Sequence, residues 1–370
     1  MTDRPTYVFA GGGTGGHLTC ALAVADALAG LQADARVLFL CTDKSIDGRF
    51  LDPTGWGEVI QPIRPLPRSP LRMGDFTLRW LRSLRLARRV LRDVRPAAVL
   101  GLGGYAAGPA VRVAARRTRT AMLNPDAIPG KANRYLARRV DTVFTQFDAT
   151  AGHFPEALRS RIHCVGCPIR REVLDADRAE ALDRFGLDVS RRTLAVMGGS
   201  LGAASVNDAV AAAAVPLAQA ADGWQILHIA GPGKTAALDA AYRQAGLPAA
   251  VVAFCDRMGD VYAAADLLIG RAGANTVAEL TATGTPGVLM PYPFHADDHQ
   301  VLNAADMVDT GAARIVRDAA DAAVNADRLV AALAPILTDP DALAAMAAAS
   351  ASLARTDAAD AVARWLAGSS

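Results

Sequence analysis

The chain has 370 residues, of which 52% are hydrophobic and 21% are charged, with a net charge of +2 at pH 7. This length and balance fit two globular domains and exclude a disordered chain. No run of about 18 uncharged apolar residues is present, so no helix is expected to span a bilayer. The first residues lack a secretory signal pattern, and we expect a reduced cytosolic setting for the five cysteines.

Charge is divided unevenly along the chain. Residues 1–165 carry 24 basic and 13 acidic side chains, a net of +11, whereas residues 166–370 carry 15 and 24, a net of −9. A positive half is suited to an anionic surface or substrate, although local ion pairing is the alternative explanation. Because Arg greatly outnumbers Lys in an alanine-rich chain, we attribute the arginine content to coding bias and predict no nucleic-acid partner.

The first half alternates strand and helix patterns. A strand over Tyr7–Ala10 leads through GGGTGGH into a helix over Leu18–Ala29, and Arg36–Leu40 is the next strand. Strand, glycine loop, helix and strand are the opening of a Rossmann-like unit. Further strands are predicted at Ala97–Leu102, Ala121–Leu123, Thr142–Thr145 and His163–Val165, and the four prolines within residues 60–73 predict a loop.

The alternation restarts after a boundary near Gly166–Arg170 and a helical connector, Arg171–Phe185. Predicted strands follow at Leu194–Met197, Gln225–Ile229, Ala250–Phe254, Leu267–Ile269 and Gly287–Met290, and alanine-rich helices at Asp339–Ser352 and Ala358–Ala367. Repeated strand–glycine-loop–helix units in both halves predict an α/β protein with two doubly wound, Rossmann-like domains that face each other across a cleft. We place these domains at residues 1–166 and 167–350, and expect the C-terminal helix of residues 351–370 to pack back toward the first domain.

Two glycine turns in the first half favour anion binding. Gly11–His17 lacks the Gly-Lys-Ser/Thr of an ATPase loop, but its small residues let several amides turn toward an anion at a helix N-terminus. Gly103–Tyr105 supplies a second turn, and tight turns without a ligand are the alternative. Gly11–Gly16 also matches the GxGxxG pattern of dinucleotide-binding loops. Cys41–Asp43 stands where such a site carries its ribose-binding acid, so an NAD site is a further alternative. The dipole at a helix N-terminus disfavours cationic His17, which makes this residue a candidate neutral base or a structural cap partner.

The stretch Gly270–Asn303 carries the strongest polar signal of the second half. Its glycine-rich turn leads into a helix with Glu279, and the strand Gly287–Met290 then ends in a loop that contains Gln300. Open parallel sheets bind ligands at the carboxyl ends of their strands, and a carboxylate near a helix start can reach a ribose diol. A capped helix followed by a solvated loop is the alternative.

Phe76–Val94 is predicted to be a basic amphipathic helix. Leu84, Ala87 and Leu91 share one face, and several arginines occupy another. This pattern fits either a helix packed on the sheet or contact with an anionic lipid interface. The spacing of Cys164 and Cys167 has no second pair to complete a zinc site, so no metal is predicted.

Seven motifs in order give nearly the whole chain a resemblance to the MurG family of UDP-GlcNAc transferases. They are GGGTGGH at Gly11–His17, GGYAAGP at Gly103–Pro109, GKANRYLA at Gly130–Ala137, VGCPIR at Val165–Arg170, GGSLGA at Gly198–Ala203, RAGANTVAEL at Arg271–Leu280, and the PYPF, HQ and NA elements within Pro291–Ala304. The resemblance implies a GT-B fold. Its N-terminal domain takes a lipid-linked acceptor at the membrane, and its C-terminal domain takes UDP-GlcNAc.

The implied activity is inverting transfer of GlcNAc from UDP-GlcNAc to the C4 hydroxyl of MurNAc in lipid I, which gives lipid II for peptidoglycan synthesis. No metal or other cofactor is implied. The implied location is the cytoplasmic face of the inner membrane, where a peripheral protein meets an anionic surface.

The resemblance also implies roles for particular residues. On the donor side, Arg170 and Ser200 match residues that hold the diphosphate, the Cys255 backbone matches a uracil contact, and Gln300 matches a sugar contact beside Asn303. The loop and helix around the phosphates and ribose correspond to Ala274, Asn275, Thr276, Val277, Ala278 and Glu279, with Glu279 on the ribose hydroxyls. Near the donor sugar and acceptor, the implied residues are Thr14, Gly15, Gly16, Gly104 and Tyr105.

One segment departs from the family pattern. Leu123, Asn124, Pro125 and Asp126 stand where the family commonly has His-Glu-Gln-Asn, so Asp126 replaces an asparagine expected to touch the GlcNAc. A carboxylate accepts hydrogen bonds but donates none. His17 and Asp126 are therefore the two candidate catalytic bases. Alternatives are a transferase for another lipid or glycan, a UDP-GlcNAc 2-epimerase, a UDP-sugar-binding scaffold with impaired catalysis, and an NAD enzyme.

Overall fold

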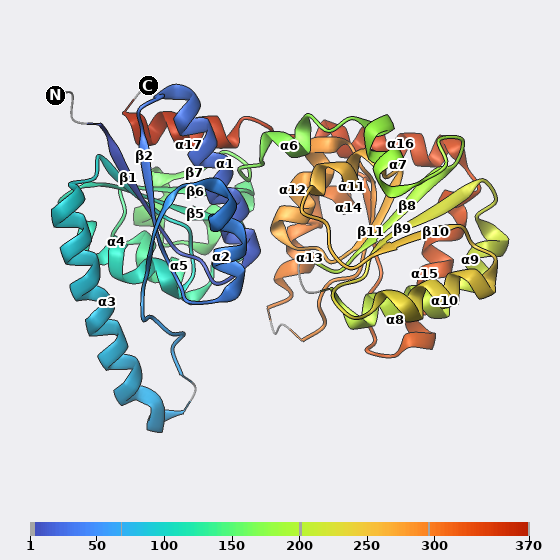
Figure 1. Cartoon of the computed structure of the whole chain (residues 1–370), viewed down its shortest axis with the longest axis horizontal. Coiled ribbons are helices and arrows are strands. Elements are labelled where there is room, and N and C mark those ends of the chain that lie inside the picture. The colour runs from blue at the N-terminus through green and yellow to red at the C-terminus, as the bar shows by residue number, and fades with distance from the viewer. Residues whose placement is uncertain (1–3, 68, 200–201, 295–296, 369–370) are drawn as a thin grey trace. The chain divides into compact units, whose positions relative to one another are not determined.

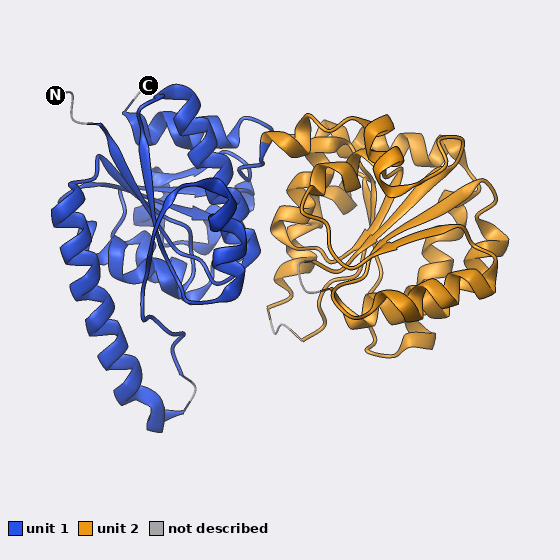
Figure 2. Ribbon diagram, in the orientation of Figure 1, with its two compact units in different colours: residues 1–170, 356–370 blue, residues 171–355 orange. Residues whose placement is uncertain are grey.

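A computed structural model describes residues 4–67, 69–199, 202–294 and 297–368. The chain divides into two compact units, residues 1–170 with 356–370, and residues 171–355 (Figure 2). Each unit contains one parallel sheet covered by helices, which confirms the predicted α/β class. Among the described helices, none alone is long and apolar enough to cross a membrane, and the one pair that meets the criteria jointly is bent by 98°.

The first unit is built on a seven-stranded sheet with the order β3-β2-β1-β4-β5-β6-β7. Its strands are β1 (Thr6–Ala10), β2 (Arg36–Cys41), β3 (Gly57–Ile60), β4 (Ala98–Gly101), β5 (Arg119–Asn124), β6 (Thr142–Thr145) and β7 (Ile162–Cys164). The strand order reverses between β1 and β4, where ligands bind in sheets of this type. The helices are α1 (Gly15–Leu31), α2 (Ser45–Leu51), α3 (Met73–Val94), α4 (Gly108–Ala114), α5 (Lys131–Ala137) and α17 (Ala358–Ala367).

The last helix belongs to the first unit. Helix α17 packs beside α1 (Figure 1), and its Trp365 ring meets the Phe144 ring edge-on at 5.8 Å between centroids. The Arg119 guanidinium lies 4.2 Å from the Trp365 ring centroid. Aromatic and cation–π contacts thus fasten the C-terminal segment to the sheet of the first unit.

The second unit has a six-stranded sheet with the order β10-β9-β8-β11-β12-β13, which reverses between β8 and β11. Its strands are β8 (Arg192–Met197), β9 (Trp224–Ile229), β10 (Ala249–Val252), β11 (Leu267–Gly270), β12 (Gly287–Leu289) and β13 (Ala313–Ile315). The helices are α6 (Arg171–Leu174), α7 (Arg178–Phe185), α8 (Ala204–Ala212), α9 (Ala214–Ala220), α10 (Thr235–Ala245), α11 (Met258–Ala264), α12 (Ala274–Thr283), α13 (His299–Asn303), α14 (Ala305–Asp309), α15 (Ala322–Leu337) and α16 (Pro340–Ser352). The core lies between the sheet and α8, α9, α10 and α15, around Trp224, Leu329 and Leu333.

The structure adds elements that the sequence patterns do not predict. Strands β3 and β13 lie at sheet edges, and the helical connector is two helices, α6 and α7, separated at residues 175–177. Helix α7 begins at Arg178 because the preceding Asp177 is its N-cap. The Asp177 side chain accepts a hydrogen bond from the Glu180 amide.

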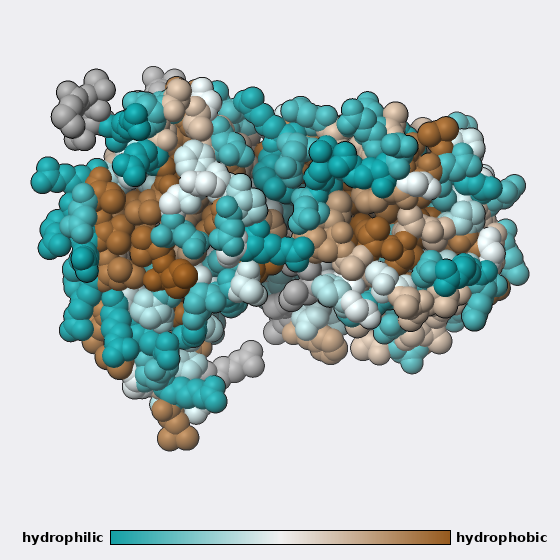
Figure 3. All heavy atoms as spheres, in the orientation of Figure 1, coloured by the Kyte–Doolittle hydropathy of each residue, from teal (hydrophilic) through white to brown (hydrophobic). Residues whose placement is uncertain are grey.

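Helix α3 has a packed half and an exposed half. Ser83, Leu84 and Ala87 in its later turns are buried beside α4, whereas its first turns extend beyond the sheet (Figure 1). The packed half begins at Trp80, whose ring lies against Gly108 at the start of α4. A Cβ added at Gly108 would lie 2.8 Å from this ring. Apolar surface is visible at the free end of this helix, with hydrophilic residues along its outer side (Figure 3).

Candidate functional site

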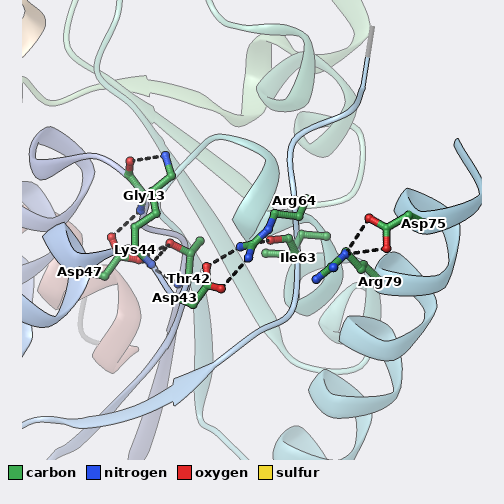
Figure 4. A network of polar contacts seen from close by, with 9 residues as sticks. All are labelled: Gly13, Thr42, Asp43, Lys44, Asp47, Ile63, Arg64, Asp75 and Arg79. Atoms are coloured by element: carbon green, nitrogen blue, oxygen red, sulfur yellow. Dashed lines mark hydrogen bonds and ion pairs between the residues drawn. The ribbon is translucent and has the colours of Figure 1, made fainter. Parts of the chain in front are cut away.

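The glycine loop after β1 is shaped by residues 11–13. All three glycines have positive φ, and a Cβ added at Gly12 would lie 2.4 Å from Asp47 Oδ2. Asp47 is buried, and its Oδ1 accepts a 2.6 Å hydrogen bond from the Gly13 amide. Its Oδ2 accepts hydrogen bonds from the amide and hydroxyl of Thr42, at 2.8 and 2.7 Å. One carboxylate therefore ties the glycine loop to the end of β2 (Figure 4).

Basic side chains surround the outer side of this loop. Lys44 Nζ donates a 2.9 Å hydrogen bond to the Gly13 carbonyl, and Arg64 forms a two-pronged ion pair with Asp43 (Figure 4). A Cβ added at Gly13 would lie 3.4 Å from both Lys44 Nζ and the Tyr105 hydroxyl, so both groups line the loop. Asp43, which an NAD site would need for the ribose, is already occupied by Arg64.

The second glycine turn is held by an asparagine relay. The Gly104 amide donates to Asn133 Oδ1 at 3.0 Å, and Asn133 Nδ2 donates to Asn124 Oδ1 at 2.8 Å. Asn124 Nδ2 in turn donates to the Asp126 carbonyl at 2.7 Å. The relay joins the ends of β4 and β5, so it sets the positions of Gly104, Tyr105 and Asp126.

His17 lies in the first turn of α1, against the second glycine turn. A Cβ added at Gly104 would lie 3.3 Å from its Cε1. Burial lowers the pKa of His17 below its ordinary value, and the opposing attraction of Asp126 is smaller. The imidazole is therefore neutral at pH 7. Its buried Nδ1 has no hydrogen-bond partner within the described part of the chain.

The first unit thus brings together the predicted residues at the carboxyl ends of β1, β4 and β5. Thr14 is exposed, whereas Gly15, Gly16, Tyr105 and Asp126 are half-buried. Cys164 does not pair with Cys167, because its thiol contacts the Gln146 carbonyl at 3.2 Å. The described residues contain no cluster of three or more His, Cys, Asp or Glu suited to a metal ion.

In the second unit, a buried ion pair holds the loops at the point of strand reversal. Arg271, directly after β11, donates from one nitrogen to Asp318 Oδ2 at 2.9 Å and to the Met290 carbonyl at 2.8 Å. Its other terminal nitrogen donates to Ser205 Oγ at 2.6 Å, and Ser205 donates to Asp318 at 2.6 Å. Burial opposes the ionised form of Asp318, but hydrogen bonds from Ser205, the Ala320 amide, Asn325 and Arg271 outweigh it and lower its pKa.

This ion pair positions the amino ends of two helices. Ser205 is in the first turn of α8, and Arg271 lies three residues before the start of α12. Ser200, a predicted diphosphate ligand, lies outside the described residues. Helix amino ends bind phosphate through their amides and dipole, so the two loops form a candidate diphosphate site.

Other predicted donor residues lie on α12 and α13 and before α11. In the predicted stretch of α12, Ala274, Val277 and Ala278 are buried, whereas Asn275, Thr276 and Glu279 are half-buried. Tyr262 on α11 donates a 2.7 Å hydrogen bond to Glu279 Oε2. Cys255 lies in the loop before α11, and its thiol contacts the Arg257 carbonyl at 3.1 Å.

The two polar residues of α13 have different surroundings. Gln300 Oε1 accepts a 2.8 Å hydrogen bond from the Tyr292 amide, which leaves its amide nitrogen as the end directed to other groups. Asn303 is fully buried and donates to the Ala272 carbonyl at 3.2 Å, so it holds the loop before α12. Arg170 is half-buried and is the last residue of the first unit before the chain enters the second.

Sequence patterns did not identify Asp47, Asn133, Asp318 or Tyr262. Asn133 lies within the GKANRYLA motif and Arg271 begins the RAGANTVAEL motif, so the motifs mark these two positions without giving their contacts. The other residues lack a local pattern, because each acts on a loop that is distant in sequence.

Comparisons with known proteins cover nearly the whole chain. The glycosyltransferase family 28 N-terminal domain matches residues 7–145, and the family 28 C-terminal domain matches residues 193–362. A Nocardioides protein named UDP-N-acetylglucosamine–N-acetylmuramyl-(pentapeptide) pyrophosphoryl-undecaprenol N-acetylglucosamine transferase is 40% identical over 96% of this chain and 96% of its own length. Proteins with the same name from Mycolicibacterium smegmatis and Geobacter sulfurreducens are 39% and 36% identical, over 97% and 96% of this chain and 92% and 96% of their own lengths.

Solved structures show the same architecture. MurG from Acinetobacter baumannii has a TM-score of 0.74 and 26% identity, and the alignment covers 98% of this chain and 100% of that one. The UDP-GlcNAc 2-epimerase from Neisseria meningitidis has a TM-score of 0.64 at 12% identity over 98% and 100% of the two chains, a likeness of fold alone. The chain therefore has a GT-B fold and belongs to the MurG family of glycosyltransferases.

Proposed function

We propose that the protein is an inverting glycosyltransferase that moves GlcNAc from UDP-GlcNAc to the C4 hydroxyl of MurNAc in lipid I, which gives lipid II. The observation that carries this proposal is the match of 96% or more of the chain to relatives named for this transfer. Both glycine-loop sites lie inside the matched region, and each is at the point where its strand order reverses.

On the acceptor side, we assign the base to His17. As the C4 oxygen forms its bond to the anomeric carbon, the bond from that carbon to the diphosphate oxygen of UDP breaks. The proton of the attacking hydroxyl passes to the neutral imidazole, and nearby Asp126 stabilises the imidazolium that forms. Lys44 and Tyr105, beside Gly13, are suited to the diphosphate of a lipid-linked acceptor.

On the donor side, the charge that develops on UDP is assigned to the amino ends of α8 and α12, together with Ser200 and Arg170. The Cys255 backbone is assigned to uracil, Glu279 to the ribose hydroxyls, and the Gln300 amide nitrogen to the sugar. Arg271 is assigned a positioning role instead, because its charge is neutralised by Asp318.

For the membrane, we propose peripheral attachment to an anionic bilayer at its cytoplasmic face through the exposed half of α3. Leu71 is 96% exposed just before this helix, and Leu78 and Leu81 are exposed on it beside Arg82 and Arg85. Large exposed apolar side chains among arginines fit an anionic lipid interface.

Vesicle sedimentation tests the membrane proposal. Serine at Leu71, Leu78 and Arg82 should lower sedimentation with anionic vesicles and leave UDP binding intact. Serine at the exposed Arg138, which lies on another part of the first unit, is the matched control for the one lost charge. Unchanged sedimentation of the α3 variant would contradict the proposal.

The central proposal is tested by product analysis with purified protein, UDP-GlcNAc and a lipid I analogue. The expected products are UDP and a lipid-linked disaccharide with inverted anomeric configuration. No UDP release with lipid I would refute the proposal, and conversion of UDP-GlcNAc to UDP-ManNAc without acceptor would instead support an epimerase.

A transferase for another lipid-linked glycan is the second candidate. It is favoured by the segment at residues 123–126, where Asn124 is committed to the relay and Asp126 presents a carboxylate near His17. Turnover of a different lipid-linked glycan, with none of lipid I, would select this alternative.

A further inference from the structure

A buried tyrosine contacts the carboxylate assigned to the ribose of the donor nucleotide. Tyr262 is 2% exposed on α11, and its hydroxyl donates a 2.7 Å hydrogen bond to Glu279 Oε2 on the neighbouring α12. This phenol group therefore links α11 to the Glu279 carboxylate on α12.

The direction of the hydrogen bond to Glu279 follows from the local chemistry. Burial, and then the nearby Glu279 carboxylate, raise the pKa of Tyr262 well above its ordinary value, so the phenol keeps its proton. An ionised carboxylate only accepts hydrogen bonds, and a phenol that keeps its proton donates one. The bond to Glu279 is thus charge-assisted, which makes it stronger than a bond between neutral groups.

Helix α11 is itself firmly anchored. Asp260, buried in its first turn, lies 2.9 Å from Arg184 Nε and 3.1 Å from Arg257 Nε. Cys255, assigned to uracil, is three residues before the start of this helix. Tyr262 therefore joins a helix fixed next to the base-reading loop to the carboxylate assigned to the ribose.

We propose that Tyr262 is a positioning residue that fixes the Glu279 carboxylate for the ribose diol of the nucleotide. A glutamate side chain can adopt several rotamers, and each contact that holds one of them lowers the entropy that binding must remove. Holding one carboxylate oxygen in place before the nucleotide arrives removes that cost, so the gain appears only for ligands whose hydroxyls the carboxylate accepts. Tyr262 thereby sets the preference for ribonucleotides over deoxynucleotides. This inference rests on the proposed donor role of Glu279.

Calorimetric titration with UDP and 2′,3′-dideoxy-UDP tests the inference. The wild-type protein should bind UDP more tightly than the dideoxy analogue. Tyr262→Phe keeps the ring and should weaken UDP binding by about two-fold to ten-fold, the effect expected when one side chain must be immobilised on binding. Binding of the dideoxy analogue should stay unchanged. Glu279→Gln should give the same pattern, and the double variant should add little to it, because both changes remove one function.

Tyr242→Phe is the matched control. Tyr242 is 1% exposed in the same unit, and its hydroxyl lies 2.6 Å from His228 Nδ1, outside the assigned donor residues. This variant should leave both affinities unchanged, although it also removes a buried phenol hydroxyl. Equal weakening of UDP and dideoxy-UDP by Tyr262→Phe, or no weakening of UDP, would overturn the inference.

The inference and the proposed function fail separately. A protein that transfers GlcNAc to lipid I, but keeps its full ribose preference after Tyr262→Phe, refutes only the role of Tyr262. A protein that loses its ribose preference in this variant, but never turns over lipid I, refutes only the proposed acceptor. A wild-type protein that binds UDP and dideoxy-UDP equally well refutes the inference through its premise that Glu279 reads the ribose.

Discussion

In the first unit the glycine loop after β1 rests on one buried carboxylate, Asp47, whereas in the second unit the loops after β8 and β11 rest on the ion pair of Arg271 with Asp318. Asp47 accepts hydrogen bonds from amide and hydroxyl groups, so its charge is balanced mainly by dipoles. Asp318 is balanced by a full positive charge. A loop can thus be held by a buried carboxylate with or without a buried cation beside it. The presence of the cation changes the electrostatic potential at the loop.

The difference matches what each loop is proposed to do. In the first unit the buried carboxylate next to the loop leaves Lys44 and Tyr105 as groups for an anion. His17 stays neutral because burial lowers its pKa by more than the carboxylates of Asp126 and Asp47 raise it. In the second unit the guanidinium is already matched by Asp318, so the helix amino ends are left to meet the diphosphate. We infer that the positive charge of Arg271 serves the loops and not the ligand.

Breaking the ion pair is expected to have the largest effect on stability. Arg271→Met leaves Asp318 buried without its cation and should cost the second unit about 3–5 kcal/mol. Hydrogen exchange resolved to each unit measures this loss. Arg243→Met is the matched control, because Arg243 pairs with Asp239 on the exposed face of α10 and should cost about 0–1 kcal/mol. Equal costs for the two variants would mean that the buried pair does not hold the loops.

Removing the carboxylate of the first unit should cost less. Asp47→Ala leaves the buried amides of Gly13 and Thr42 without an acceptor, at about 1–3 kcal/mol in the first unit. Asp43→Ala, four residues earlier and exposed, breaks only the surface pair with Arg64 and should stay below about 1 kcal/mol. The same exchange measurement separates the units. Destabilisation of the second unit by Asp47→Ala would contradict the separate anchoring of the two loops.

Sequence patterns predicted the glycine loops because the backbone conformation requires them. Gly12 and Gly13 have positive φ, and a side chain at Gly12 would collide with Asp47, so glycine is required and is recognisable in the sequence. The residues that hold these loops stand in no recognisable local pattern. The bond from Gly13 to Asp47 spans 34 residues and that from Arg271 to Asp318 spans 47, which only the fold brings together.

The predicted strands differ in the same way. Leu194–Met197 and Leu267–Ile269 are continuous buried apolar runs, typical of central strands in a parallel sheet, and both were predicted. Strand β3 has three exposed residues of four, and β13 has only three residues, so neither of these two edge strands produces an apolar run. The other edge strands, β7 and β10, were predicted. Sequence patterns therefore identified every central strand but only two of the four edge strands.

The two units also differ in the surroundings of their histidines. His228 in the second unit is held by Tyr242 at 2.6 Å and Asn207 at 3.2 Å, and burial lowers its pKa to about 3. The unfolded chain binds this proton near pH 6.5, so stability is fully present above that pH and is lost as the pH falls toward 3. Between pH 6.5 and 5 this loss should be about 1.5 kcal/mol.

Hydrogen exchange of the second unit at several pH values measures this loss. His228→Gln removes the titrating group and should flatten the pH dependence, whatever its effect on stability at pH 7. Exposed His153→Gln in the first unit is the control and should leave the slope unchanged. An unaltered slope in His228→Gln would mean that the imidazole is already charged in the folded protein.

The smallest expected effect concerns His17, whose Nδ1 has no partner among the described residues, in contrast to His228. Burial lowers the pKa of His17, so as a base it should keep kcat/KM constant from pH 7 down to below 6.5 before activity falls. The negative charge of Asp126 raises the pKa of His17, so Asp126→Asn should move the acidic limb of the profile to still lower pH, by less than about one unit. Asp148→Asn removes a carboxylate after β6, away from the loop, and should leave the limb in place. A shift of the limb to higher pH in Asp126→Asn would instead assign this titration to another group, and loss of activity at every pH would make Asp126 the stronger candidate for the base.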